Sequence, residues 1–185
     1  GIYARLFTSD VDGENIYLLN DSGRMSHFCW KNENQILGWG GISNPINSLR
    51  KYKNSVNYLV KPLMPIYKYL VRGDSVVGNS KISSLVTGDG YIIFTDQTKH
   101  KNKKNVLKRI DRDGHPSFSK NNENLMITDT YPDLTNDHVQ QLILCDFKKE
   151  KITIIDTLKH NKELSQGASR CDLHPKWSFD GKLVC

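Results

Sequence analysis

The segment LHPKWSFDGKLVC, residues 173–185, has the pattern of a short strand, a tight turn and a second strand. Two earlier segments share this pattern: SHFCWKNENQILGW from Ser26 and GHPSFSKNNENLMITDT from Gly114. In each, a histidine precedes an aromatic residue by three positions, in the pairs His27 and Trp30, His115 and Phe118, and His174 and Trp177. Asn, Asp and Gly suit the turn, and aromatic and β-branched residues suit strands. An internal repeat of this kind indicates a repeating β architecture, with the three aromatic residues expected in the core between repeats.

Further hairpins lie between the repeated segments. The stretches YARLFTSDVDGENIYLLND from Tyr3 and QQLILCDFKKEKITIIDT from Gln140 each read as strand, turn and strand, and GYIIFTD and NVLKRI form another pair. A repeated segment followed by a hairpin supplies four antiparallel strands, and few segments have helical periodicity. The sequence therefore predicts an all-β fold: a partial β-propeller of about three four-stranded blades.

The spacing of the histidines identifies an insertion. His27 and His115 are 88 positions apart, whereas His115 and His174 are 59 apart. Removal of the 47 residues 42–88 shortens the first spacing to 41, close to the roughly 40–50 residues of one blade. We therefore expect residues 1–185 to form a single partial propeller domain that contains 42–88 as an insertion. Both ends of the sequence fall within blades, which predicts an arc with open strand edges that favour aggregation over a stable monomer.

The insertion is basic. Residues 42–88 contain seven Lys or Arg residues and one acid, Asp74, so this segment alone carries a charge of +6, equal to that of the whole chain. Apolar residues recur at helical spacing between Leu59 and Val71, with Pro65 suited to a helix start and Gly73 to a helix stop, which predicts a short helix. Three interpretations stay open: a helix packed over the propeller, a protein contact between subunits, or a basic amphipathic patch on an anionic membrane surface. No nucleic-acid-binding motif accompanies the charge, so nucleic acid is not an expected partner.

Composition narrows the class of protein. Apolar residues make up 37% and charged residues 25% of the chain, which argues against wholesale disorder, and no apolar run approaches the length of a membrane span. The four cysteines form no CxxC pair, which favours buried, reduced thiols over disulfides or a zinc site. The N-terminal stretch lacks the features of a signal peptide, so we expect a cytoplasmic protein. A signal removed by processing stays an alternative, because the sequence does not begin with Met.

Three stretches carry a family resemblance. SDVDGENIYLLND, GHPSFSKNNENLMITDTYPD and RCDLHPKWSFDGKLVC resemble blades of TolB-type propellers and, more specifically, of the oligogalacturonate lyase-like propeller proteins. The resemblance covers most of the chain outside 42–88. It implies a seven-bladed propeller that cleaves short uronides by β-elimination, with a divalent metal, usually Mn²⁺, held by histidines and a glutamine on the funnel face of the propeller.

The resemblance also implies particular site residues. His115 and His174 fall where metal-binding histidines would sit. Asp172 stands where the lyases carry another histidine, and Ser169 stands where the glutamine is expected. A His-Asp-His set remains a reasonable nitrogen and oxygen site for Mn²⁺ or a similar ion.

β-Elimination from a uronide also needs a neutralised carboxylate and a base. We expect Arg170 to bind a substrate carboxylate in a bidentate manner and His27 to act as the base, because its ordinary pKa lies near neutrality. A structural interpretation competes with these roles. The three histidines occupy the same position of the repeat, which is typical of a shared structural role, and Arg170 and Asp172 are close enough in sequence to pair with each other. The loop TDTYPD, residues 128–133, has no assigned role.

Two functional hypotheses follow. In the first, the protein is an enzyme that resembles oligogalacturonate lyase and acts on acidic, uronate-containing oligosaccharides by metal-assisted β-elimination. In the second, it is a non-catalytic TolB-like propeller that binds a protein or a surface-polysaccharide component. Bound metal and an unsaturated product would distinguish the first from the second.

Overall fold

Antiparallel strands dominate the computed structural model, which describes residues 4–23, 25–41, 89–96, 103–106, 110, 112–134, 136–165, 167 and 170–185. The insertion 42–88, with its expected helix and contacts, and Ser169 lie outside the described residues. The elements are β1 (Ala4–Thr8), β2 (Tyr17–Gly23), β3 (Met25–Asn32), β4 (Gln35–Gly41), β5 (Asp89–Thr95), β6 (Lys103–Val106), β7 (Ser117–Ser119), β8 (Asn122–Asp129), β9 (Val139–Asp146), β10 (Lys151–Lys159) and the short 3₁₀ helix η2 (Lys162–Leu164). The all-β prediction is confirmed for this part of the chain, in which no helical segment has the length and apolar character of a membrane span.

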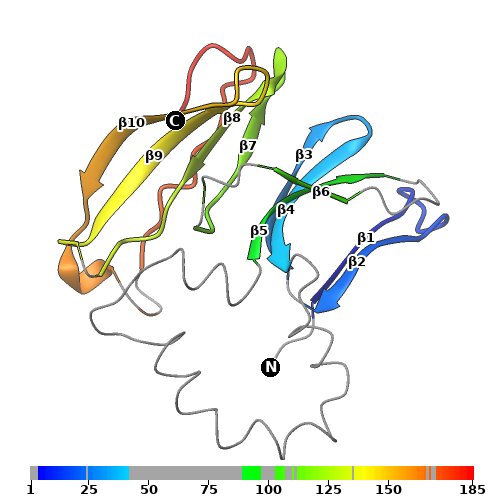
Figure 1. The fold of residues 1–185 in the computed structure, drawn as a ribbon, viewed down its shortest axis with the longest axis horizontal. Coiled ribbons are helices and arrows are strands. Elements are labelled where there is room, and N and C mark those ends of the chain that lie inside the picture. The colour runs from blue at the N-terminus through cyan, green and yellow to red at the C-terminus, as the bar shows by residue number, and fades with distance from the viewer. Residues whose placement is uncertain are drawn as a thin grey trace, which may run out of the picture.

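The strands form three open antiparallel sheets in chain order (Figure 1). One is the hairpin β1-β2, and the others are the four-stranded meanders β3-β4-β5-β6 and β7-β8-β9-β10. The strands that precede and follow residues 42–88, β4 and β5, pair with each other, because Gly41 at the end of β4 lies directly opposite Asp89 at the start of β5. The predicted insertion therefore joins two neighbouring strands of one sheet.

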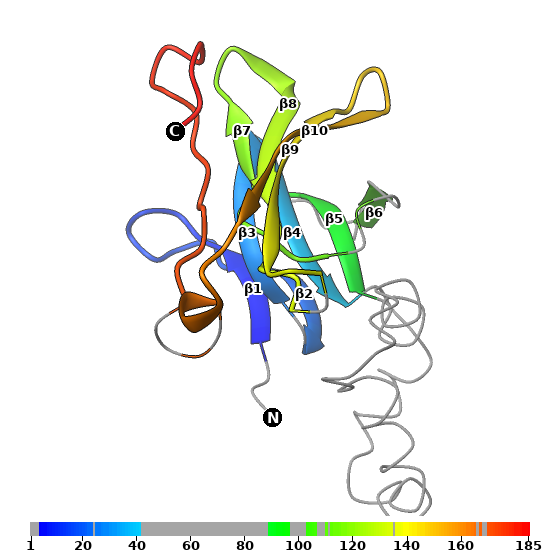
Figure 2. The ribbon, with the colours of Figure 1, turned by 90° about the vertical axis from the view of Figure 1, so that its left-hand side faces the viewer.

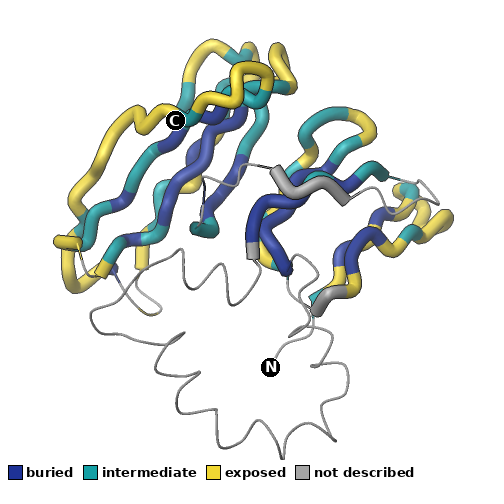
Figure 3. Tube along the Cα trace, viewed as in Figure 1, coloured by how far each residue is buried: buried dark blue, intermediate teal, exposed yellow. Residues whose placement is uncertain are grey.

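The core lies between successive sheets. Leu37, Trp39 and Tyr91 on one face of β3-β6 pack against Met126 and Cys145 of β7-β10. The opposite face of β3-β6 packs on the hairpin β1-β2, through a second cluster of Leu6, Leu19, Ile36, Ile92 and Phe94. Strand β4 is consequently buried on both faces, which is why its sequence QILGWGG lacks the alternation of a half-exposed strand (Figure 3).

The C-terminal segment covers the first strand of the last sheet. The indole Nε1 of Trp177 donates a hydrogen bond of 3.0 Å to the carbonyl oxygen of Ser117 in β7. The segment runs beside this sheet in an extended path (Figure 2). Here the predicted strand-turn-strand is reduced to a turn closed by one isolated bridge between Trp177 and Val184.

Two side-chain predictions are wrong in part. Trp30 is 51% exposed, although it was expected in the core, because alternation along β3 points it away from Cys29, which packs against the core. All four cysteines are free, but only Cys145 is fully buried, and Cys171 and Cys185 are exposed because they lie in the C-terminal segment outside the sheets.

Candidate metal centre

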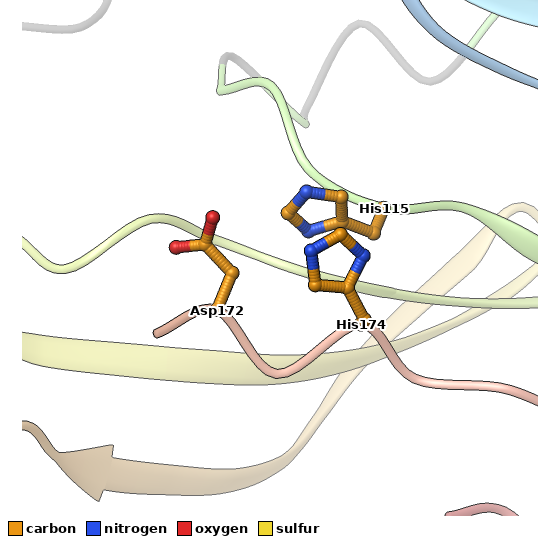
Figure 4. Close-up of side chains that lie close together, drawn as sticks. All are labelled: His115, Asp172 and His174. Carbon is orange, nitrogen blue, oxygen red and sulfur yellow. The ribbon is translucent and has the colours of Figure 1, made fainter. Parts of the chain in front are cut away.

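The three predicted metal ligands lie together (Figure 4). His115, two residues before β7, is buried, Asp172 is half-buried as a residue, and His174 is exposed. Each offers one ligand atom, and these atoms lie within 4.8 Å of one another. In a tetrahedral site, ligand atoms at about 2.1 Å from one ion lie about 3.4 Å apart, so the side chains would draw together to hold a single cation. The two imidazole rings overlap, with centroids 3.6 Å apart.

A buried carboxylate supports this group from behind. Asp129, at the end of β8, is 1% exposed. Both its oxygens lie 2.9 Å from Nδ1 of His115. Its Oδ1 accepts a 2.7 Å hydrogen bond from the backbone N–H of His115, and its Oδ2 accepts a 3.1 Å bond from the backbone N–H of His174. With Nδ1 of His115 directed at this carboxylate, the free ligand atom of that ring is Nε2.

Asp172 pairs with Arg170, as the structural interpretation anticipated. Nη2 of Arg170 donates a 2.9 Å hydrogen bond to Oδ2 of Asp172, and Nε lies 2.8 Å from Oδ1 without hydrogen-bond geometry. The Oδ1 atom is buried and accepts no hydrogen bond from the described residues. This oxygen is therefore a fitting donor for a cation. The ion pair also raises the pKa of Arg170.

Arg170 also lies over an aromatic ring. Its guanidinium is 4.1 Å from the ring centroid of Tyr131, a cation–π arrangement. Burial raises the pKa of Tyr131 to about 12, and the neighbouring Asp113 adds to the effect. Tyr131 therefore remains protonated at neutral pH.

His27 lies at the edge of the same group. Its ring centroid is 4.4 Å from that of His115, and its Nδ1 is 3.1 Å from Oδ1 of Asp113. The Tyr131 hydroxyl lies 3.4 Å from Nε2 of His27. The hydrogen bond to Asp113 raises the pKa of His27 despite partial burial of the ring, so this imidazole is a stronger base than an isolated one.

All five residues chosen from the sequence thus meet in one place: His27, His115, Arg170, Asp172 and His174. Sequence reasoning missed Asp113, Asp129 and Tyr131. Asp129 and Tyr131 belong to the loop TDTYPD, which had no assigned role, and Asp113 directly precedes the GHP stretch. These three residues could have been chosen from the sequence because they lie near the predicted strand ends that are closest to the repeated histidines.

Comparisons of the chain with models of known protein families, with curated proteins and with solved structures found no match.

Proposed function

We propose that the three sheets are consecutive blades of a β-propeller arc. The support is their order: each meander follows the chain, and each sheet packs face to face on the next. Neighbouring blades of a propeller share a core in this way, as do the two sheets of a β-sandwich, and the succession of three sheets in chain order favours the propeller. His27 lies in β3, the first strand of one sheet, and His115 precedes β7, the first strand of the next. In a propeller arc both histidines would face the central funnel.

We further propose that the protein is a metal-dependent lyase for uronate-containing oligosaccharides. The observation that carries this proposal is the convergence of His115, Asp172 and His174 beside a carboxylate-bound histidine and a protonated tyrosine. The donor set, two imidazoles and one carboxylate, suits Mn²⁺ or a similar divalent ion. When bound, such an ion withdraws charge from a coordinated substrate carboxylate and so acidifies the neighbouring C–H.

The chain's own residues supply the proton transfers. His27, held through Nδ1 by Asp113, accepts the proton from the carbon next to the carboxylate at Nε2, which lies 3.4 Å from the Tyr131 hydroxyl. The electron pair of that C–H bond forms the double bond as the glycosidic C–O bond breaks, and the departing oxygen takes a proton from the Tyr131 hydroxyl. Arg170 adds a positive charge beside the site, and its five N–H donors exceed those that Asp172 uses.

The experiment is incubation of the chain with Mn²⁺ and short oligogalacturonates, followed by the ultraviolet absorbance of the unsaturated product. Asp172→Asn is expected to abolish the absorbance increase. Asp146→Asn is the matched control, because Asp146 is the last residue of β9 and its side chain, among the described residues, bonds only Lys148 and Lys149. The proposal fails if the unaltered chain forms no product, or if both variants retain full activity.

A second candidate is non-catalytic binding of an acidic polysaccharide. A hollow of about 790 Å³ lies beside the β3–β4 and β7–β8 turns. It is lined by the exposed Trp30, by three lysines (Lys31, Lys120 and Lys176) and by two acids (Glu33 and Glu123), of which Glu123 lies 3.7 Å from Nζ of Lys31. An aromatic face for a sugar ring beside ammonium groups for its carboxylate favours this ligand. Oligogalacturonate binding to the metal-free chain that is lost in Trp30→Ala but kept in His174→Ala would support this candidate over the lyase.

A further inference from the structure

Asp129 joins two segments that are far apart in sequence. Its carboxylate is bonded to His115, 14 residues earlier, and to His174, 45 residues later. The side chain is fully buried, with 0% exposure. A buried carboxylate is costly unless its oxygens are satisfied, and here three N–H groups satisfy it, all from the two histidines.

We propose that Asp129 is the positioning residue that assembles the metal site, by setting the tautomer of His115 and by fixing the backbone of His174. This inference rests on the proposed metal-dependent function. It assigns no metal bond to Asp129 itself.

Nδ1 of His115 faces the carboxylate of Asp129. A carboxylate only accepts hydrogen bonds, so Nδ1 carries the proton that points between the two oxygens of Asp129. The lone pair of the neutral ring then lies on Nε2, the atom left free for a cation. In metalloproteins such a carboxylate partner fixes the ring orientation and raises the basicity of the ligand.

His174 has a strained backbone conformation. Its φ is +47°, in the left-handed region that a non-glycine residue enters only at an energetic cost. Pro175 follows directly and is buried, which restricts the conformation of His174 further. The hydrogen bond from the His174 N–H to Oδ2 of Asp129 compensates this cost, since it holds the backbone in the conformation that stacks the ring of His174 on that of His115.

An amide at position 129 cannot replace these contacts. With the Asn oxygen in place of Oδ1, the NH₂ group faces the His174 N–H; with the oxygen in place of Oδ2, it faces the His115 N–H. Two donors meet in either orientation. The amide also favours transfer of the His115 proton from Nδ1 to Nε2, which removes the lone pair from the ligand atom.

The test is calorimetric titration of the full chain with Mn²⁺, comparing the unaltered protein with Asp129→Asn and Asp113→Asn. Asp129→Asn is expected to weaken binding about 10–100-fold, the usual effect of removing such a partner. Asp113→Asn is the matched control: it also removes a carboxylate bonded to an imidazole, but that imidazole, His27, is outside the ligand set. It should change the affinity much less than Asp129→Asn does.

The outcomes separate this inference from the proposed function. Absence of Mn²⁺ binding by the unaltered chain would refute the metal-dependent function, and with it the metal-holding role of Asp129. Binding by the unaltered chain with unchanged affinity in Asp129→Asn, or equal losses in both variants, would overturn this inference alone.

A second measurement needs no variant, in case Asp129→Asn does not fold. Nitrogen-15 NMR of the imidazole rings in the unaltered, metal-free chain reports which nitrogen of His115 carries the proton. We expect a protonated Nδ1 and an unprotonated Nε2 at a pH at which the ring is neutral. The opposite tautomer would overturn the inference.

Discussion

Gly114 is the position where a single added carbon should disturb both the fold and the proposed metal site. An ideal Cβ built there would lie 2.0 Å from the carbonyl oxygen of Asp129 and 2.9 Å from Oγ1 of Thr128. The nearest atom belongs to the backbone of β8 and cannot rotate away. Gly114→Ala therefore forces the chain before β7 away from β8.

The displacement can be worked out from these contacts. Ordinary van der Waals contact begins at 3.4 Å, so the 2.0 Å approach must lengthen by at least 1.4 Å. Overpacking of this kind costs about 1–3 kcal/mol of unfolding free energy. Because His115 is the next residue, its ring should move by a similar distance, far beyond the about 0.2 Å tolerance of metal–ligand distances. We expect Mn²⁺ affinity to fall at least about tenfold.

The assays are urea-induced unfolding, followed by tryptophan fluorescence, and calorimetric Mn²⁺ titration. Gly13→Ala is the control: Gly13 has a φ of +85° but no atom within 4 Å of the added Cβ. That variant should lose about 1 kcal/mol through backbone strain alone and keep its metal affinity. Wild-type stability and metal affinity in Gly114→Ala would refute the reasoning.

Three further predictions concern the site and its supports. Asp113→Asn should lower the pKa of His27 toward its ordinary 6.5, measured by NMR titration of the ring protons; an unchanged pKa would show that Asp113 is not the cause. Because the folded-state pKa is raised, this ion pair stabilises the fold fully below the ordinary pKa, and the stabilisation is lost as the pH rises through the raised value. Met126→Ala, in the core between the two four-stranded sheets, should cost about 2–5 kcal/mol in urea unfolding, whereas a loss below about 1 kcal/mol would contradict tight packing there. Trp177→Phe keeps an aromatic ring but loses the bond to Ser117, so the free energy of unfolding should fall by about 0.5–1.5 kcal/mol and amide exchange in residues 173–178 should quicken; unchanged exchange would mean that this bond does not hold the segment.

Local sequence patterns predicted the strands well because short-range physics determines them. Alternating apolar residues and turn-forming residues marked the hairpins β1-β2, β7-β8 and β9-β10. The insertion 42–88, expected from the repeat spacing, lies outside the described residues; the strands on either side of it pair from Gly41 opposite Asp89. The identity of the described strands could therefore be obtained without any tertiary information.

Tertiary contacts explain what the sequence did not reveal. Asp129 reads as an ordinary polar residue at a strand end, and its role depends on N–H groups 14 residues before it and 45 residues after it. Trp30 carries the same repeat signal as Phe118, yet it is 51% exposed and lines a hollow, because side-chain direction along β3 and the neighbouring turns decides its environment. Residue types and their spacing in the sequence do not predict which distant residues will form hydrogen bonds with each other.

The most direct test of the account is a crystal structure of the full chain soaked with Mn²⁺, with anomalous diffraction used to locate the ion. The account predicts one anomalous peak per chain, in contact with Nε2 of His115, a ring nitrogen of His174 and a carboxylate oxygen of Asp172. Absence of a peak between these three side chains, or a peak elsewhere in the molecule alone, would contradict it.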